Sequence, residues 1–96
     1  SFDTFCPLGP VIQTEFEESP ELNIKCYVNG ELKQDGNTRD MIFSIEDIVC
    51  FVSTIMTLLP GDVILTGTPE GVSKVVPGDE ITIQIETIGT LINTVK

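Results

Sequence analysis

The sequence contains no histidine and no tryptophan, and its five basic residues stand against fifteen acidic ones. Without histidine, neither a Ser-His-Asp triad nor a Cys-His pair can be built from this chain alone. The formal net charge of −10 opposes binding to phosphate backbones, which need Lys and Arg, so no nucleic-acid partner is expected. The apolar runs are too short for a transmembrane helix, so no membrane partner is expected either.

Cysteine is also scarce, because only Cys6, Cys26 and Cys50 are present and they lie far apart. An odd number at wide spacing argues against a disulfide framework and against a zinc ribbon. We expect all three to be small buried hydrophobic residues in a reducing compartment. The N-terminus has no signal-peptide pattern and the C-terminus no lipidation or targeting motif, so the sequence predicts a cytoplasmic protein.

Strand patterns occupy much of the chain. Residues 22–28 alternate between apolar and polar side chains and run into Asn29-Gly30, the strongest two-residue signal for a hairpin. Residues 80–95 alternate in the same way, with a turn near Ile88-Gly89. The apolar run 63–66 predicts a short buried strand between these two regions. Residues 1–14, with two prolines and a glycine, predict an irregular buried segment.

One helix is predicted, from about Ile45 to Leu58. Ser44 is a natural N-cap, and the apolar residues that follow fall at helical spacing on one face until Pro60-Gly61 ends the pattern. The class is therefore α+β, with a mainly antiparallel sheet that forms part of a mixed β-sandwich or roll, and one amphipathic helix packed on the sheet. Such a core is thin, so we expect the chain to complete a larger sheet or a dimer.

Three polar segments are candidates for function. The segment 15–21 holds four glutamates and is either a solvated loop or a cation site. The segment 34–41 (QDGNTRDM) is a hairpin exit or a site, and the segment 66–71 (TGTPEG) is a turn or a loop that grips a small anionic ligand. The aspartates form no E-x-D or D-x-D pair, and Asp62 and Asp79 each belong to a Pro-Gly-Asp turn, so metal binding by this chain alone is poorly supported.

Three stretches, SFDTFCPLGP, VNGELKQDGNTRDMIFSIEDI and LTGTPEGV with the GDEI and IETIGTL segments that follow, together resemble the fumarylacetoacetate hydrolase family. The likeness is to its small members, the acylpyruvases, oxaloacetate decarboxylases and 2-hydroxyhepta-2,4-diene-1,7-dioate isomerases. It covers the whole chain in order, and it implies that residues 1–96 are the C-terminal portion of a longer catalytic domain.

The resemblance also implies how the site is shared between this chain and the rest of the enzyme. The family binds Mg²⁺ or Mn²⁺, in some members Ca²⁺, through a Glu-x-Glu pair and an Asp that lie upstream of this segment. Its active-site lysine would directly precede Ser1, and its His-Glu lid pair is also upstream. No catalytic residue and no metal ligand of the family is therefore expected within this chain.

Two residues remain from the family's substrate site. Thr68 would bind a carboxylate or another substrate oxygen with its hydroxyl and backbone, and Gly67 would let the ligand approach the backbone. The implied substrates are small 2-oxo or 1,3-dicarbonyl acids, on which a metal-stabilised enolate leads to C–C hydrolysis, decarboxylation or isomerisation. The expected assembly is a homodimer. The alternative is a catalytically inactive fragment that only folds and self-associates.

Overall fold

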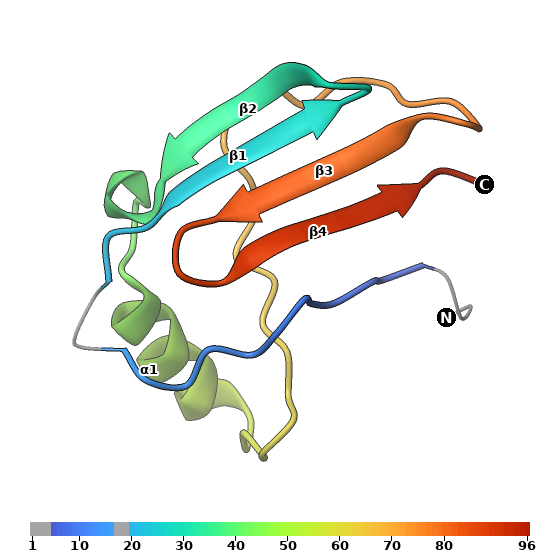
Figure 1. Cartoon of the computed structure of the whole chain (residues 1–96). Coiled ribbons are helices and arrows are strands. Elements are labelled where there is room, and N and C mark those ends of the chain that lie inside the picture. Colours follow the sequence, from blue (N-terminus) through green and yellow to red (C-terminus); the bar gives the residue numbers. More distant parts are fainter. Residues whose placement is uncertain (1–4, 17–19) are drawn as a thin grey trace.

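The computed structural model describes residues 5–16 and 20–96 of the chain. In these residues the chain forms, in order, β1 (Asn23–Val28), β2 (Glu31–Asn37), the 3₁₀ turn η1 (Thr38–Asp40), α1 (Ile45–Ile55), β3 (Glu80–Ile85) and β4 (Gly89–Thr94). The strands make one four-stranded antiparallel sheet in the order β2-β1-β3-β4 (Figure 1). The predicted α+β class with one helix and a mainly antiparallel sheet is confirmed.

The β1–β2 hairpin forms where Asn29-Gly30 predicts it. Both residues have positive φ, 51° and 80°, as a type I′ turn requires. The Asn29 side chain also ties this turn to the start of β3, because its Nδ2 donates to Asp79 Oδ1 at 2.9 Å and its Oδ1 accepts from the Glu80 N–H at 2.9 Å. One irregularity interrupts the hairpin, between Cys26 and Tyr27, and leaves Lys33 as an extra residue on β2.

Two Pro-Gly-Asp turns share one geometry, which confirms the turn chemistry predicted for them. Asp62 Oδ2 accepts from the Leu59 N–H at 2.8 Å, and Asp79 Oδ2 accepts from the Val76 N–H at 2.9 Å. Only the second turn is also bonded to Asn29. These bonds, first the one from the Val76 backbone and then the one from Asn29, favour the carboxylate and hold the pKa of Asp79 below its usual value.

Asp79 is expected to stabilise the fold at neutral pH and to lose this effect in acid. Because its pKa is lower in the folded chain, the unfolded chain binds the proton more readily; the stabilisation is complete above the unfolded pKa of about 3.9 and disappears as pH falls through the lower folded value. Asp79→Ala should therefore lower the melting temperature at pH 7 more than Asp62→Ala does, as measured by circular dichroism. The gap between the two variants should narrow as pH falls below about 3.9. Equal losses at pH 7 would contradict the role of the Asn29 contact.

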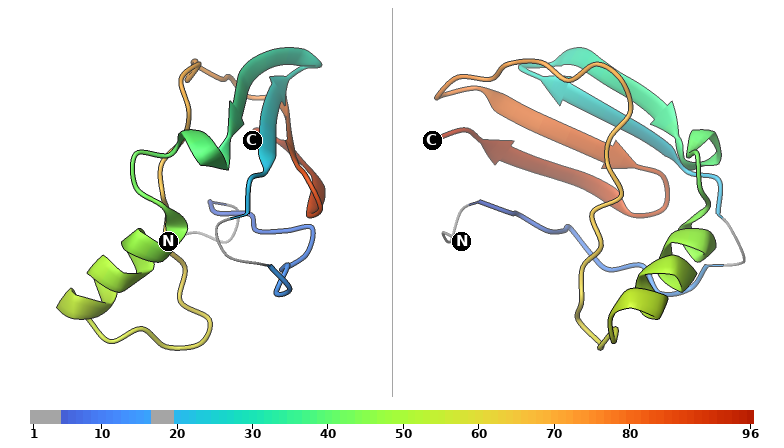
Figure 2. Two further views of the ribbon diagram at one scale, coloured as in Figure 1. Left: turned by 90° about the vertical axis from the view of Figure 1, so that its left-hand side faces the viewer. Right: turned by 180° about the vertical axis from the view of Figure 1, so that it is seen from behind.

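The sheet has one apolar and one polar face. Paired residues place Ile24, Cys26, Ile83, Ile85 and Leu91 on one side, whereas Lys25, Gln84 and Thr90 lie on the other. The long segment between α1 and β3 crosses behind the strands in Figure 1 and in front of them in the reversed view of Figure 2. It crosses the apolar face, because Gln34, which pairs with Cys26, is hydrogen-bonded to Thr68 and Pro69 of that segment.

No described residue is fully buried, and many large apolar side chains are exposed. The helix α1 lies beyond one end of the sheet instead of on its face (Figures 1 and 2). Ser44 caps it as predicted, by accepting from the Asp47 N–H at 3.1 Å, but it ends at Ile55 because Met56 is extended. The prediction that its apolar face packs on the sheet is wrong for the described residues. On that face Val49 and Ile55 are 42% and 64% exposed, because an apolar stripe indicates that a partner is needed without indicating which one.

Three further predictions of burial are also wrong. Residues 63–66 form no strand, and Val63 and Leu65 are exposed, because an apolar run cannot be a buried strand unless neighbouring strands flank it. Cys6 and Cys50 are exposed and Cys26 is only half-buried, and all three are free. The described part of the N-terminal segment is irregular, as predicted, but residues 5–12 are exposed instead of buried. Residues 1–4, and residues 17–19 of the acidic segment, lie outside the described residues.

Candidate functional site

Two hydrogen bonds fix the loop 66–71, a functional candidate from the sequence, to the edge strand β2. The Gln34 side chain of β2 makes both: its Nε2 donates to Thr68 Oγ1 at 2.6 Å and to the carbonyl oxygen of Pro69 at 2.7 Å. Both partners lie 34 or 35 residues further along the chain. The loop is therefore held by tertiary contacts as well as by its own turn chemistry.

Two glycines let the loop and the strand approach each other closely. A Cβ on Gly36 of β2 would lie 3.2 Å from the ring of Pro69, and a Cβ on Gly71 would collide with the carbonyl oxygen of Lys33. Two of the segments predicted as functional candidates, 34–41 and 66–71, thus meet at one place. Sequence reasoning did not predict this contact, and no spacing between the segments indicates it.

The outer side of the loop is open. Thr68 is exposed, and Gly67 has a φ of 88° with no atom within 4 Å of the position that its Cβ would take. The structure therefore presents a hydroxyl beside a stretch of backbone that a ligand can approach closely. Hydroxyl and backbone N–H groups in this arrangement suit an oxygen acceptor such as a carboxylate.

The rest of the segment 34–41 acts as a connection. Asn37 Oδ1 accepts from the Arg39 N–H at 2.9 Å and caps η1. Thr38 Oγ1 accepts from the Leu22 N–H at 2.9 Å and donates to the carbonyl oxygen of Pro20 at 2.6 Å. These bonds fix the chain on its way to α1, so the hairpin-exit interpretation accounts for residues 37–40.

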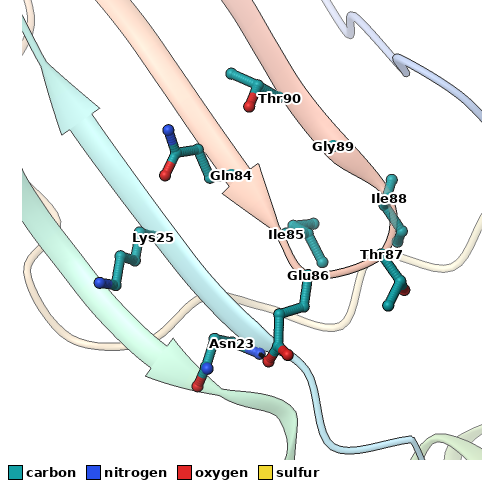
Figure 3. A pocket seen from close by; sticks show the side chains of 9 residues that line it. All are labelled: Asn23, Lys25, Gln84, Ile85, Glu86, Thr87, Ile88, Gly89 and Thr90. Atoms are coloured by element: carbon teal, nitrogen blue, oxygen red, sulfur yellow. Dashed lines mark hydrogen bonds between the residues drawn. The ribbon is translucent and has the colours of Figure 1, made fainter.

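A shallow hollow lies over the polar face of the sheet (Figure 3). Its lining comes from β1, β3, β4 and the turn between the last two: Asn23, Lys25, Gln84, Ile85, Glu86, Thr87, Ile88, Gly89 and Thr90. Glu86 Oε1 accepts from the Asn23 backbone N–H at 2.7 Å, so this carboxylate links the turn after β3 to the start of β1. Because Lys25 and Gln84 lie on the opposite face from Gln34, the hollow is separate from the Thr68 loop.

The described residues do not provide a metal centre. Among residues 5–16 and 20–96, no three His, Cys, Asp or Glu side chains gather closely enough to hold an ion. The ligands that the family resemblance implies would lie outside this chain. In the same residues, no helix has the length and apolar character needed to span a bilayer.

Comparison with known proteins gives the chain its family. The family model described as fumarylacetoacetate (FAA) hydrolase C-terminal matches residues 1–96. An uncharacterized protein of Methanocaldococcus jannaschii is 54% identical over 96 residues, which are 100% of this chain and 40% of that protein. The human mitochondrial oxaloacetate tautomerase FAHD2A is 47% identical over 104 residues, with 99% of this chain and 33% of that protein covered.

The fold is shared with a solved enzyme as well. The crystal structure of maleylpyruvate hydrolase from Sphingobium sp. SYK-6, in complex with manganese(II) and pyruvate, matches with a TM-score of 0.91 and 45% identity. The match covers 99% of this chain and 37% of that one. The chain thus spans well under half the length of the relatives it matches. Because the family model covers every residue, the chain belongs to the fumarylacetoacetate hydrolase family.

Proposed function

We propose that residues 1–96 are the C-terminal portion of a catalytic domain that acts on small 2-oxo or 1,3-dicarbonyl acids. The observation that carries this proposal is the anchored loop 66–71, which presents the exposed Thr68 hydroxyl beside the open backbone at Gly67. Thr68 and Gly67 are the substrate-binding residues, and they orient a carboxylate or carbonyl oxygen by hydrogen bonding. The reaction is C–C hydrolysis, decarboxylation or isomerisation.

The proposed enzyme depends on Mg²⁺ or Mn²⁺, or on Ca²⁺. The support is family membership and one relative, the Sphingobium hydrolase, whose structure holds manganese(II) and pyruvate. Such an ion would act as a Lewis acid on a substrate oxygen. The family resemblance implies that the ion's ligands would come from residues outside this chain, and no donor cluster is found among residues 5–16 and 20–96.

The proposed assembly is a cytoplasmic homodimer in which the rest of the enzyme and a second copy cover the exposed apolar surfaces. Support comes from the absence of any fully buried residue among those described and from exposed side chains such as Ile42 and Phe51. The human relative is mitochondrial by name, so the compartment of this chain remains a prediction. No nucleic-acid or membrane partner is proposed.

The second candidate function is a catalytically inactive fragment that folds and self-associates. The same exposed apolar side chains favour it, since self-association would also cover them. The two candidates differ in one property, because only the first requires turnover by a longer protein that contains these 96 residues.

The full-length protein is expected to turn over an acid from a panel of acylpyruvates, oxaloacetate and 2-hydroxyhepta-2,4-diene-1,7-dioate, with Mg²⁺ or Mn²⁺ present. The purified 96-residue chain is expected to be inactive, because the implied lysine, lid and metal ligands are not among its residues. Steady-state kinetics on both forms are the test. If the short chain shows metal-dependent turnover in proportion to its concentration, the assignment of all catalytic groups to the rest of the enzyme is wrong. If the full-length protein converts no acid, the second candidate stands.

A further inference from the structure

Gln34 lies at the centre of the contact between β2 and the loop 66–71, and its amide has only one possible orientation. The carbonyl oxygen of Pro69, 2.7 Å from Nε2, can only accept a hydrogen bond. The NH₂ group, and not Oε1, must therefore face Pro69. The geometry thus settles a choice that is otherwise ambiguous for a glutamine side chain.

This orientation fixes the role of Thr68. Its Oγ1 lies 2.6 Å from the same Nε2, and an amide nitrogen is a donor only. Thr68 Oγ1 must therefore accept from Gln34, so its own hydroxyl hydrogen is left for another partner. A hydroxyl that accepts one hydrogen bond is also polarised and becomes a better donor in the next one.

We propose that Gln34 is a positioning residue that makes the Thr68 hydroxyl a hydrogen-bond donor to an anionic oxygen of the ligand. This inference rests on the proposed function, because it takes Thr68 as the residue that binds substrate. The relay runs from the Gln34 amide to the Thr68 hydroxyl and then to a carboxylate or enolate oxygen. It favours ligands that accept hydrogen bonds at this position.

The test uses Gln34→Met, which keeps the length of the side chain and removes the donor, in the full-length protein. The expected result is a fall in kcat/KM of about 3- to 30-fold, from the loss of one or two hydrogen bonds. The informative step is to repeat the change in a Thr68→Val background, where no hydroxyl remains to be oriented. There Gln34→Met should lower kcat/KM by no more than about 2-fold further. Equal losses in the two backgrounds would show that Gln34 only anchors the loop, which would overturn the proposal.

Gln34→Glu gives a second readout, the pH dependence of kcat/KM. An ionised carboxylate can only accept, so the Thr68 hydroxyl would donate to it instead of to the ligand. We expect a larger loss than for Gln34→Met at pH 8 and a partial recovery of kcat/KM as pH falls toward 5, because a protonated carboxyl can donate again. The same pH profile for Gln34→Glu and Gln34→Met would contradict the relay.

The matched control is Gln84→Met, which changes a glutamine on the polar face of the same sheet, opposite to the loop. Its kcat/KM should stay within about 2-fold of the wild type, as is usual for an exposed residue away from the site. Binding of pyruvate in the presence of Mn²⁺, measured by calorimetry, provides a readout without turnover. If the wild type neither binds pyruvate nor converts any acid of the panel, the proposed function fails, and this inference with it. If Thr68→Val weakens binding and turnover but Gln34→Met is additive with it, only this inference fails.

Discussion

Gly71→Ala is expected to detach the loop 66–71 from β2 and to destabilise the protein by about 2–5 kcal/mol. Two effects add. The φ of Gly71 is 103°, which strains any residue that has a Cβ, and the new Cβ would also collide with the carbonyl oxygen of Lys33. The obstacle is backbone, not the flexible end of a side chain, so the loop has to move. The Gln34 bonds to Thr68 and Pro69 would then break, and kcat/KM should fall at least about 10-fold.

Gly78→Ala is the matched control for this prediction. Its φ of 95° imposes a similar backbone strain, but no atom lies within 4 Å of the position that its Cβ would take. The strain alone should cost about 1–3 kcal/mol and leave kcat/KM nearly unchanged. Thermal unfolding and steady-state kinetics of the two variants separate the collision from the strain. If both variants lose the same stability and keep wild-type kinetics, the contact between the loop and β2 does not contribute to catalysis.

The elements that the sequence predicts correctly are those whose signals are local. Asn29-Gly30 determines a hairpin by its own φ preferences, and the alternation of Ile81, Ile83 and Ile85 determines the face of β3. The errors concern what those elements pack against. Residues 63–66 and the apolar face of α1 both indicate burial, yet no residue of either segment is fully buried, and Val63, Leu65 and Ile55 are exposed. Hydrophobic pattern shows that a surface needs a partner, and it carries no information on where that partner is.

The candidate site divides in the same way. The loops 34–41 and 66–71 could be selected from the sequence, because both concentrate residues with turn-forming and hydrogen-bonding side chains. Their contact could not be predicted, since Gln34 and Thr68 are 34 residues apart and no sequence motif contains both residues. The proposed role of Thr68 rests on family resemblance and not on spacing. The proposed role of Gln34 rests on the folded structure, in which one nitrogen donates to two acceptors.

Thr68→Ala in the full-length protein is expected to lower kcat/KM by about 10- to 100-fold, with little effect on folding. A hydrogen bond to a charged ligand oxygen is worth about 1.5–3 kcal/mol, and the hydroxyl that would make it is removed. Stability should change little because Thr68 is exposed and Gln34 keeps its bond to the Pro69 carbonyl. Thr68→Ser, which retains the hydroxyl, should recover most of the activity. Kinetics and thermal melting of both variants are the measurements.

Thr66→Ala is the control on the same loop. Thr66 is also an exposed threonine, but it lies two residues before the one that Gln34 orients, so its loss should cost less than about 3-fold in kcat/KM. The comparison matters because a turn and a ligand-binding loop share the same composition. If TGTPEG were only a turn, the two alanine variants would behave alike and both would keep near wild-type kinetics. A loss at Thr68 that is absent at Thr66, with both proteins equally stable, would support a hydrogen bond between the Thr68 hydroxyl and the ligand.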